Sequence, residues 1–193
     1  MRLTDAVNTR ADYAKPENRE IGRVSAIVEA AGYTRWNRVE ETIEFAHRMA
    51  FKRLGIAFCV GMREEAKILN AILKANGFEV VSAACKTGAI PKEELGLSDD
   101  QKVRPGTTEM MCNPIGQAHL LNEAQTEFNI IFGLCVGHDS LFIKHADALT
   151  TCLVAKDRAL AHNPIGGIYC AWGYYRDRVY HQHRQEAAPG SSG

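Results

Sequence analysis

Four short apolar segments, with helical patterns between them, constrain the fold of this 193-residue chain more than any other feature. The segments are 54–58, 78–83, 128–134 and 149–155. Strands that are buried on both faces have this nearly continuous apolar composition, and intervening helices are typical of parallel pairing. We therefore predict an α/β fold with a doubly wound, mostly parallel sheet flanked by helices, as a single domain with an N-terminal helical extension.

The N-terminal part carries helical patterns and no strand pattern. Apolar residues at helical spacing indicate two helices, and Asn37 followed by Glu40 fits a capping box at the start of the second one. We expect residues 1–52 to pack as helices on an α/β core that spans 53–184. The polar tail 185–193 is expected to be disordered.

The charge balance limits the classes of partner. Lys and Arg number 23, and Asp and Glu also number 23, so no net field favours nucleic acid or an anionic membrane. No apolar run approaches the length of a membrane span, and the polar first residues do not resemble a signal peptide. We expect a cytoplasmic protein that binds neither partner, and we leave open whether two chains pair as a homodimer. In a reducing compartment, six cysteines favour ligands, nucleophiles or small core residues over disulfides.

Four of the cysteines lie where strands are predicted to end or a helix to begin. Cys59, Cys85 and Cys135 follow apolar segments, and Cys112 precedes an Asn-Pro pair that is typical of a helix start. The carboxyl ends of parallel strands share one edge of the sheet, so these thiols are expected to converge there. We predict that they ligate one metal or cluster in the 53–184 core. Cys152 and Cys170 fit core packing instead.

The predicted site accepts several kinds of group. Both zinc and iron–sulfur clusters bind four thiolates, but a domain of this size needs no metal to fold, so we favour a [4Fe-4S] cluster. If three cysteines ligate, one iron stays open for Lewis-acid, non-redox chemistry on a small polar substrate. The acid–base candidates are then His138, Asp139 and His162, although such residues also serve as ordinary hydrogen-bonding groups at helix starts. A structural zinc protein and an electron carrier are the alternatives.

An alternative from another class rests on residues 133–137. The sequence Gly-Leu-Cys-Val-Gly has the G-x-C-x-G form of a nucleophile elbow, and it resembles glutamine amidotransferases and related cysteine hydrolases that would use Cys135. The downstream His-x-Glu pair of such enzymes is absent. The elbow therefore indicates a cysteine hydrolase or amidotransferase less strongly than the four cysteines indicate a metal site.

Two further segments carry side chains of interest. The stretch 86–108 is rich in Gly, Pro and charge, and it is expected to form a long functional loop. Its basic residues either receive an anionic substrate or form a solvated surface; they are Lys86, Lys92, Lys102 and Arg104. Near the C-terminus, Trp172, Tyr174 and Tyr175 are expected to pack in a helix, with a partner surface as the other interpretation.

Several sequence blocks resemble an uncharacterised family of predicted metal-binding proteins from bacteria and archaea. The resemblance covers about residues 38–169, and its blocks include LGIAFCVGMREEA, CKTGAIPKEELGL, MCNPIGQAHLLNEA and GLCVGHDSLFIKHADA. It implies metal binding. It also places Cys59, Cys85, Cys112 and Cys135 within the characteristic blocks of the family.

Overall fold

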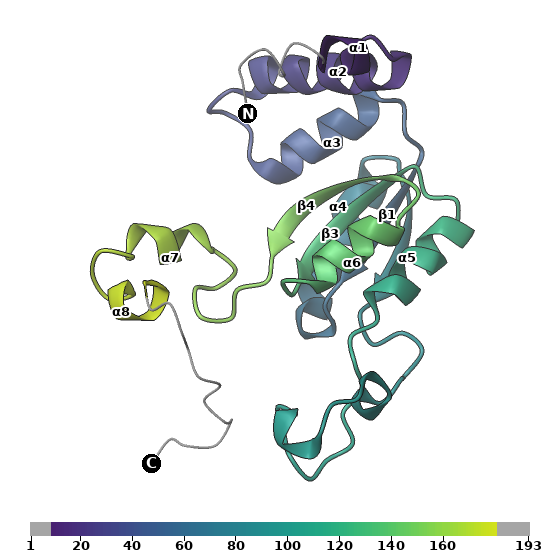
Figure 1. Ribbon diagram of the computed structural model, residues 1–193. Helices are drawn as coiled ribbons and strands as arrows, with labels where there is room; N and C mark the ends of the chain where they lie inside the picture. Colours follow the sequence, from purple (N-terminus) through teal and green to yellow (C-terminus); the bar gives the residue numbers. More distant parts are fainter. Residues whose placement is uncertain (1–8, 181–193) are drawn as a thin grey trace.

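A computed structural model describes residues 9–180 of the chain (Figure 1). Its centre is one sheet of four parallel strands in the order β2-β1-β3-β4. The strands are β1 (Arg53–Phe58), β2 (Glu79–Ala84), β3 (Phe128–Leu134) and β4 (Leu149–Ala155). Helices cover both faces of this sheet, so the predicted doubly wound α/β fold is confirmed. The predicted bounds of β3 and β4 are also confirmed.

Three helices connect successive strands and divide the core into two layers. They are α4 (Arg63–Ala75), α5 (Pro114–Glu123) and α6 (His138–His145). Helix α4 packs on one face of the sheet, where its Leu69 and Leu73 meet Ile56 and Ile130. Helices α5 and α6 pack together on the other face. Each crossover therefore returns the chain to the same starting edge of the sheet, as parallel pairing requires.

The N-terminal residues form a helical layer beside the sheet. It consists of α1 (Thr9–Tyr13), α2 (Pro16–Gly32) and α3 (Arg38–Arg48), and α3 lies between α2 and the sheet in Figure 1. The predicted capping box is confirmed, because the Asn37 side chain accepts from the Val39 and Glu40 amides while the Glu40 carboxylate accepts from the Asn37 amide. Ala46 of α3 is fully buried against the core.

Two glycines in the central strands allow neighbouring side chains to lie very close to the backbone. A Cβ at Gly55 would lie 2.1 Å from the Asn129 side-chain oxygen. Gly133 has a φ of +71°, and a Cβ there would lie 2.2 Å from the Met62 sulfur. Both distances are far shorter than van der Waals contact, so these positions accept only glycine without rearrangement.

The long loop between β2 and α5 contains two short 3-10 helices, η3 (Lys92–Leu95) and η4 (Asp99–Gln101). An isolated antiparallel bridge joins Pro91 to Met110 and closes the loop on itself. Lys102 is buried and forms ion pairs with Glu93 and Asp99. This lysine therefore stabilises the loop instead of receiving a ligand.

The C-terminal segment differs from its predicted packing. It contains two short helices, α7 (Ile165–Tyr169) and α8 (Arg176–Val179), which lie apart from the sheet in Figure 1. Trp172 and Tyr174 are 81% and 80% exposed, so the prediction that they pack in a helix is wrong. Cys152 and Cys170 are also exposed, because one lies on the edge strand β4 and the other follows α7. The tail 185–193 lies outside the described residues.

Candidate functional site

The carboxyl ends of β1 and β3 form the topological switch point of the sheet. These strands are neighbours, but the chain leaves them for opposite edges, β2 and β4, and ligands of open α/β folds bind at such a point. Cys59 follows β1 directly and Cys135 follows β3. The Cys59 amide donates to the Phe132 carbonyl at 3.1 Å, which ties the two strand ends together.

Three cysteine side chains meet beside this point. The Cys85 thiol, which follows β2, packs in one cluster with Cys59 and Cys112, and the three thiols shift one another's pKa values. We call these three residues the thiol triad. Cys59 and Cys85 are buried and Cys112 is half-buried. The Val60 amide donates to the Cys85 sulfur at 3.3 Å, so a backbone dipole also points into the group.

Helix α5 holds the triad against the strand ends. The Asn113 side chain caps this helix by accepting from the Gly116 amide at 2.8 Å. Gln117, which is fully buried, donates to the Phe58 and Ala83 carbonyls at 3.1 and 2.7 Å and so joins the ends of β1 and β2. The sequence analysis missed Gln117; a polar residue on the buried side of a helix is the signal that could have indicated it.

The hydrogen bonds and nearby cations give the three thiols different pKa values. The hydrogen bond from Cys85, aided by the Gly61 amide and Lys156, lowers the pKa of Cys59 to about 5. The hydrogen bond from Cys85, with the charges of Lys86 and His138, lowers the pKa of Cys112 to about 6. The same two hydrogen bonds and burial raise the pKa of Cys85. These shifts favour the thiolate forms of Cys59 and Cys112 over that of Cys85.

The fourth cysteine has other surroundings. The Cys135 thiol is half-buried and accepts a hydrogen bond from the Arg158 guanidinium at 3.3 Å. Positive φ angles occur at Gly133 and Gly137, whereas Cys135 is not among the described residues with a positive φ. A nucleophile elbow places strain on the nucleophile itself, but here the left-handed angles belong to the flanking glycines, which adopt them without strain. The hydrogen-bond donor to this sulfur is thus an arginine.

The three acid–base candidates lie in different surroundings. His138 begins α6 and lines the same cavity as Cys112 and Cys135. The Asp139 carboxylate accepts from the Ser140 amide at 2.7 Å. His162 has a φ of +62°, and its Nδ1 accepts from the Asp157 amide at 3.1 Å, which fixes it in the turn after β4. Only His138 therefore shares a wall with the cysteines among the described cavity residues.

A cavity of about 810 Å³ opens beside the thiols, and we call it the thiol cavity. Its walls come from the long loop, the turn after β3 and the segment after β4. The last segment contributes Arg158, while Lys156 lies near the Cys59 sulfur. The sequence analysis missed both cations. Their positions immediately after β4, on the same edge as the cysteines, are the signal that could have indicated them.

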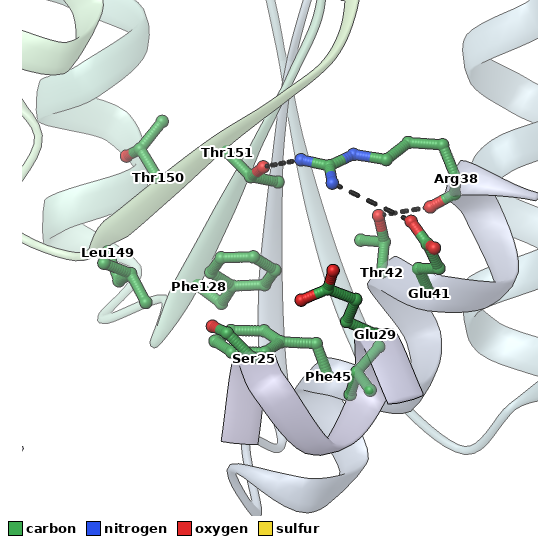
Figure 2. A pocket seen from close by; sticks show the side chains of 11 residues that line it. Ser25, Glu29, Arg38, Glu41, Thr42, Phe45, Phe128, Leu149, Thr150 and Thr151 are labelled. Atoms are coloured by element: carbon green, nitrogen blue, oxygen red, sulfur yellow. Dashed lines mark hydrogen bonds and ion pairs between the residues drawn. The ribbon is translucent and has the colours of Figure 1, made fainter. Parts of the chain in front are cut away.

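A second pocket, of about 410 Å³, lies at the opposite edge of the sheet (Figure 2). Its walls come from α2, α3 and the first residues of β3 and β4. Within it, Arg38 donates to the Thr151 hydroxyl at 3.0 Å and pairs with Glu41 at 3.9 Å. None of the site residues predicted from the sequence lines this pocket. It is a polar junction between the helical layer and the sheet.

In the range 9–180, no group of three or more His, Cys, Asp or Glu side chains has the arrangement of a metal-ion site. No helix within that range is long and apolar enough to cross a membrane. Metal binding, a cluster and a cytoplasmic location remain predictions.

Comparison with known proteins identifies uncharacterised relatives. Residues 3–153 match a family described as a protein of unknown function (DUF1847). An uncharacterized protein of the archaeon Methanocaldococcus jannaschii is 50% identical over 158 residues, which cover 82% of this chain and 80% of that protein. No solved structure matches the chain. The predicted resemblance to an uncharacterised family with an archaeal member is confirmed, whereas the metal-binding character of that family stays a prediction.

Proposed function

The chain belongs to the DUF1847 family, and we propose that it is an iron–sulfur protein whose [4Fe-4S] cluster is held by Cys59, Cys85 and Cys112. One observation carries the proposal: three thiols from separate parts of the chain interact at the switch point of a parallel sheet. Single buried cysteines are common, but here three pack in one cluster at the strand ends, and Cys112 also lines the neighbouring cavity.

The chemistry of the triad suits thiolate ligation. Metal binding requires deprotonated sulfur, and two of the three thiols already have lowered pKa values. Backbone amides at Val60 and Gly61 donate to the sulfurs, as is common around iron–sulfur clusters, where such bonds tune the cluster. Loading would release the Cys85 proton and rearrange these side chains, because the thiol hydrogen bonds are replaced by bonds to metal.

Cys135 occupies a different place in the proposal. It lies in the wall of the thiol cavity with Arg158, outside the hydrogen-bonded triad. We propose that three cysteines would ligate and that Cys135 would not be a ligand. A cluster held in this way would supply Lewis-acid chemistry toward an oxygen of a small polar substrate. His138 lines the same wall and is the residue that would transfer a proton there.

Anaerobic purification with analysis of iron, zinc and acid-labile sulfide tests this proposal. We expect about four iron atoms and four sulfides per chain. Stoichiometric zinc without sulfide would support a structural zinc protein instead. Metal-free protein that carries a rapidly alkylated Cys135 and hydrolyses amides would support the cysteine hydrolase. Either of these outcomes contradicts the cluster.

A further inference from the structure

The thiol cavity is large enough for a small organic molecule and is open to its entry. Its volume of about 810 Å³ lies within the range of small-molecule sites, which is about 300–1,000 Å³. Part of its wall is apolar, from residues of the long loop: Leu95, Leu97, Val103, Met110 and Met111. This wall suits a short aliphatic body more than a fully hydrated inorganic ion.

The charges that line the cavity are mostly positive. Lys86, Lys92, Arg104 and Arg158 contribute cations, whereas Glu109 is the one carboxylate among the described residues that line it. Glu109 forms an ion pair with Lys92, so these two charges balance each other. Lys86 donates to the Met110 carbonyl, and its charge lowers the pKa of Cys112. Arg104 and Arg158 are therefore the surplus of positive charge that remains for a bound anion.

The thiolates alone do not account for this surplus. Near the triad, Lys156 already lies beside Cys59 without lining the cavity. Arg104 belongs to the long loop, not to the rim of strand ends, and its backbone amide donates to Glu109 at 2.7 Å. Arg104 thus lines the cavity from the long loop, and Arg158 lines it from the segment after β4.

We propose that the thiol cavity binds a small aliphatic dicarboxylate, with one carboxylate on Arg158 beside Cys135 and the other on Arg104. Arginine is suited to this ligand because its planar guanidinium binds a carboxylate through two parallel hydrogen bonds. The inference that a dicarboxylate is the substrate rests on the proposed function. Binding of the dicarboxylate itself does not require the cluster.

Calorimetric titration of the full chain with succinate tests the site, before and after anaerobic reconstitution with iron and sulfide. We expect binding in at least one of these states, with butyrate and inorganic phosphate binding more weakly. Arg104→Gln and Arg158→Gln should each weaken succinate binding about tenfold or more, because each removes a charge-assisted contact. The matched control is Arg19→Gln, on exposed α2, which should bind like the wild type.

A variant that should bind succinate more tightly serves as a second control, because misfolding would weaken binding and could not strengthen it. Glu109→Gln keeps an oxygen that accepts from the Arg104 amide but removes the cavity carboxylate, so succinate should bind a few-fold more tightly. Equal affinity in both arginine variants and the wild type would overturn the site, as would tighter binding of phosphate than of succinate. Cluster content is measured on the same samples. Succinate binding by a chain that takes up no iron and sulfide on reconstitution would refute the cluster alone, and a reconstituted cluster without succinate binding would refute the dicarboxylate site alone.

Discussion

The sequence Cys-Val-Gly occurs twice in this protein, each time after a central strand, and the two copies have different structures. Cys59 is buried in the thiol triad, and a 3-10 helix, η2 (Val60–Met62), follows it. Cys135 is half-buried beside Arg158, and its turn is made by Gly137 with a φ of +83°. The same three-residue sequence therefore places one sulfur in the core, at Cys59, and the other in the cavity wall, at Cys135.

The difference shows that the surroundings of Cys59 and Cys135 are determined by the neighbouring elements and not by the local sequence. Around Cys59, the end of β2 supplies Cys85 and the start of α5 supplies Cys112, and the three residues pack in one cluster. Around Cys135, the residue supplied is Arg158, from the segment after the edge strand β4. Equivalent positions in a parallel sheet thus take on separate roles according to which strand lies beside them.

The largest expected effect is on iron content. Serine at Cys59, Cys85 or Cys112 should remove most of the iron and sulfide, because each change deletes a proposed ligand. Cys135→Ser should retain most of it. Cys152→Ser, on the exposed edge strand, is the control and should match the wild type. Equal iron loss in the Cys59 and Cys135 variants would contradict the proposal that Cys59 is a ligand and Cys135 is not.

The second effect is on pH-dependent stability of the metal-free protein. The pKa values of Cys59 and Cys112 are lowered to about 5 and about 6, below the roughly 8.5 of an unfolded thiol. The unfolded chain therefore binds more protons between about pH 6 and pH 8, and the free energy of unfolding should rise over that interval. The stabilisation should disappear as the pH falls through the two folded-state values.

Urea denaturation at several pH values measures this slope. Replacing both Cys59 and Cys112 by serine should flatten it, whereas Cys135→Ser should leave it in place. A wild-type stability that falls as the pH rises through this interval would refute the proposed pair of thiolates.

The third effect concerns the Asn-Pro-Ile-Gly sequence, which is also repeated. Asn113 caps α5 through the Gly116 amide, whereas the corresponding segment at Asn163 precedes the five-residue helix α7, which has no side-chain cap. Asn113→Ala should lower the free energy of unfolding by about 1–2 kcal/mol, as measured by urea denaturation. Asn163→Ala should change it by less than about 0.5 kcal/mol. Equal effects would mean that the two copies are structurally equivalent.

The smallest effect tests the two turns themselves. Gly137→Ala forces a side chain into the left-handed region and should cost about 1 kcal/mol in thermal or urea unfolding. Gly61→Ala should be nearly neutral, since its Cβ would meet only ordinary contacts at 3.8 Å from Cys59 and Lys156. If Gly61→Ala lowered the free energy of unfolding more than Gly137→Ala, the stated difference between the two turns would be wrong.

The sheet could be predicted from the sequence because burial on both faces gives a strand an unmistakable composition. The segments 128–134 and 149–155 are strands with those bounds, and the Asn37 capping box is present. The order of the strands could not be predicted, because it depends on which helix crosses which face. That order determines which cysteines meet, so the thiol triad was not distinguishable from Cys135 in the sequence.

Side chains whose partners lie far along the chain were harder to predict. Lys102 and Arg104 are two residues apart in one loop, yet the first is buried in ion pairs and the second lines the thiol cavity. Apolar composition misled the prediction for Trp172 and Tyr174, because the segment after β4 leaves the sheet and has no described layer above it. Composition indicates burial only where an element packs against another one.

Mössbauer spectroscopy of the wild-type chain loaded anaerobically with 57Fe tests the central claim most directly. A [4Fe-4S] cluster on three thiolates predicts that one iron, about a quarter of the signal, differs from the others and shifts when succinate is added. Signals from four equivalent thiolate-ligated irons would contradict the separate role of Cys135. The absence of any cluster signal would contradict the proposed function.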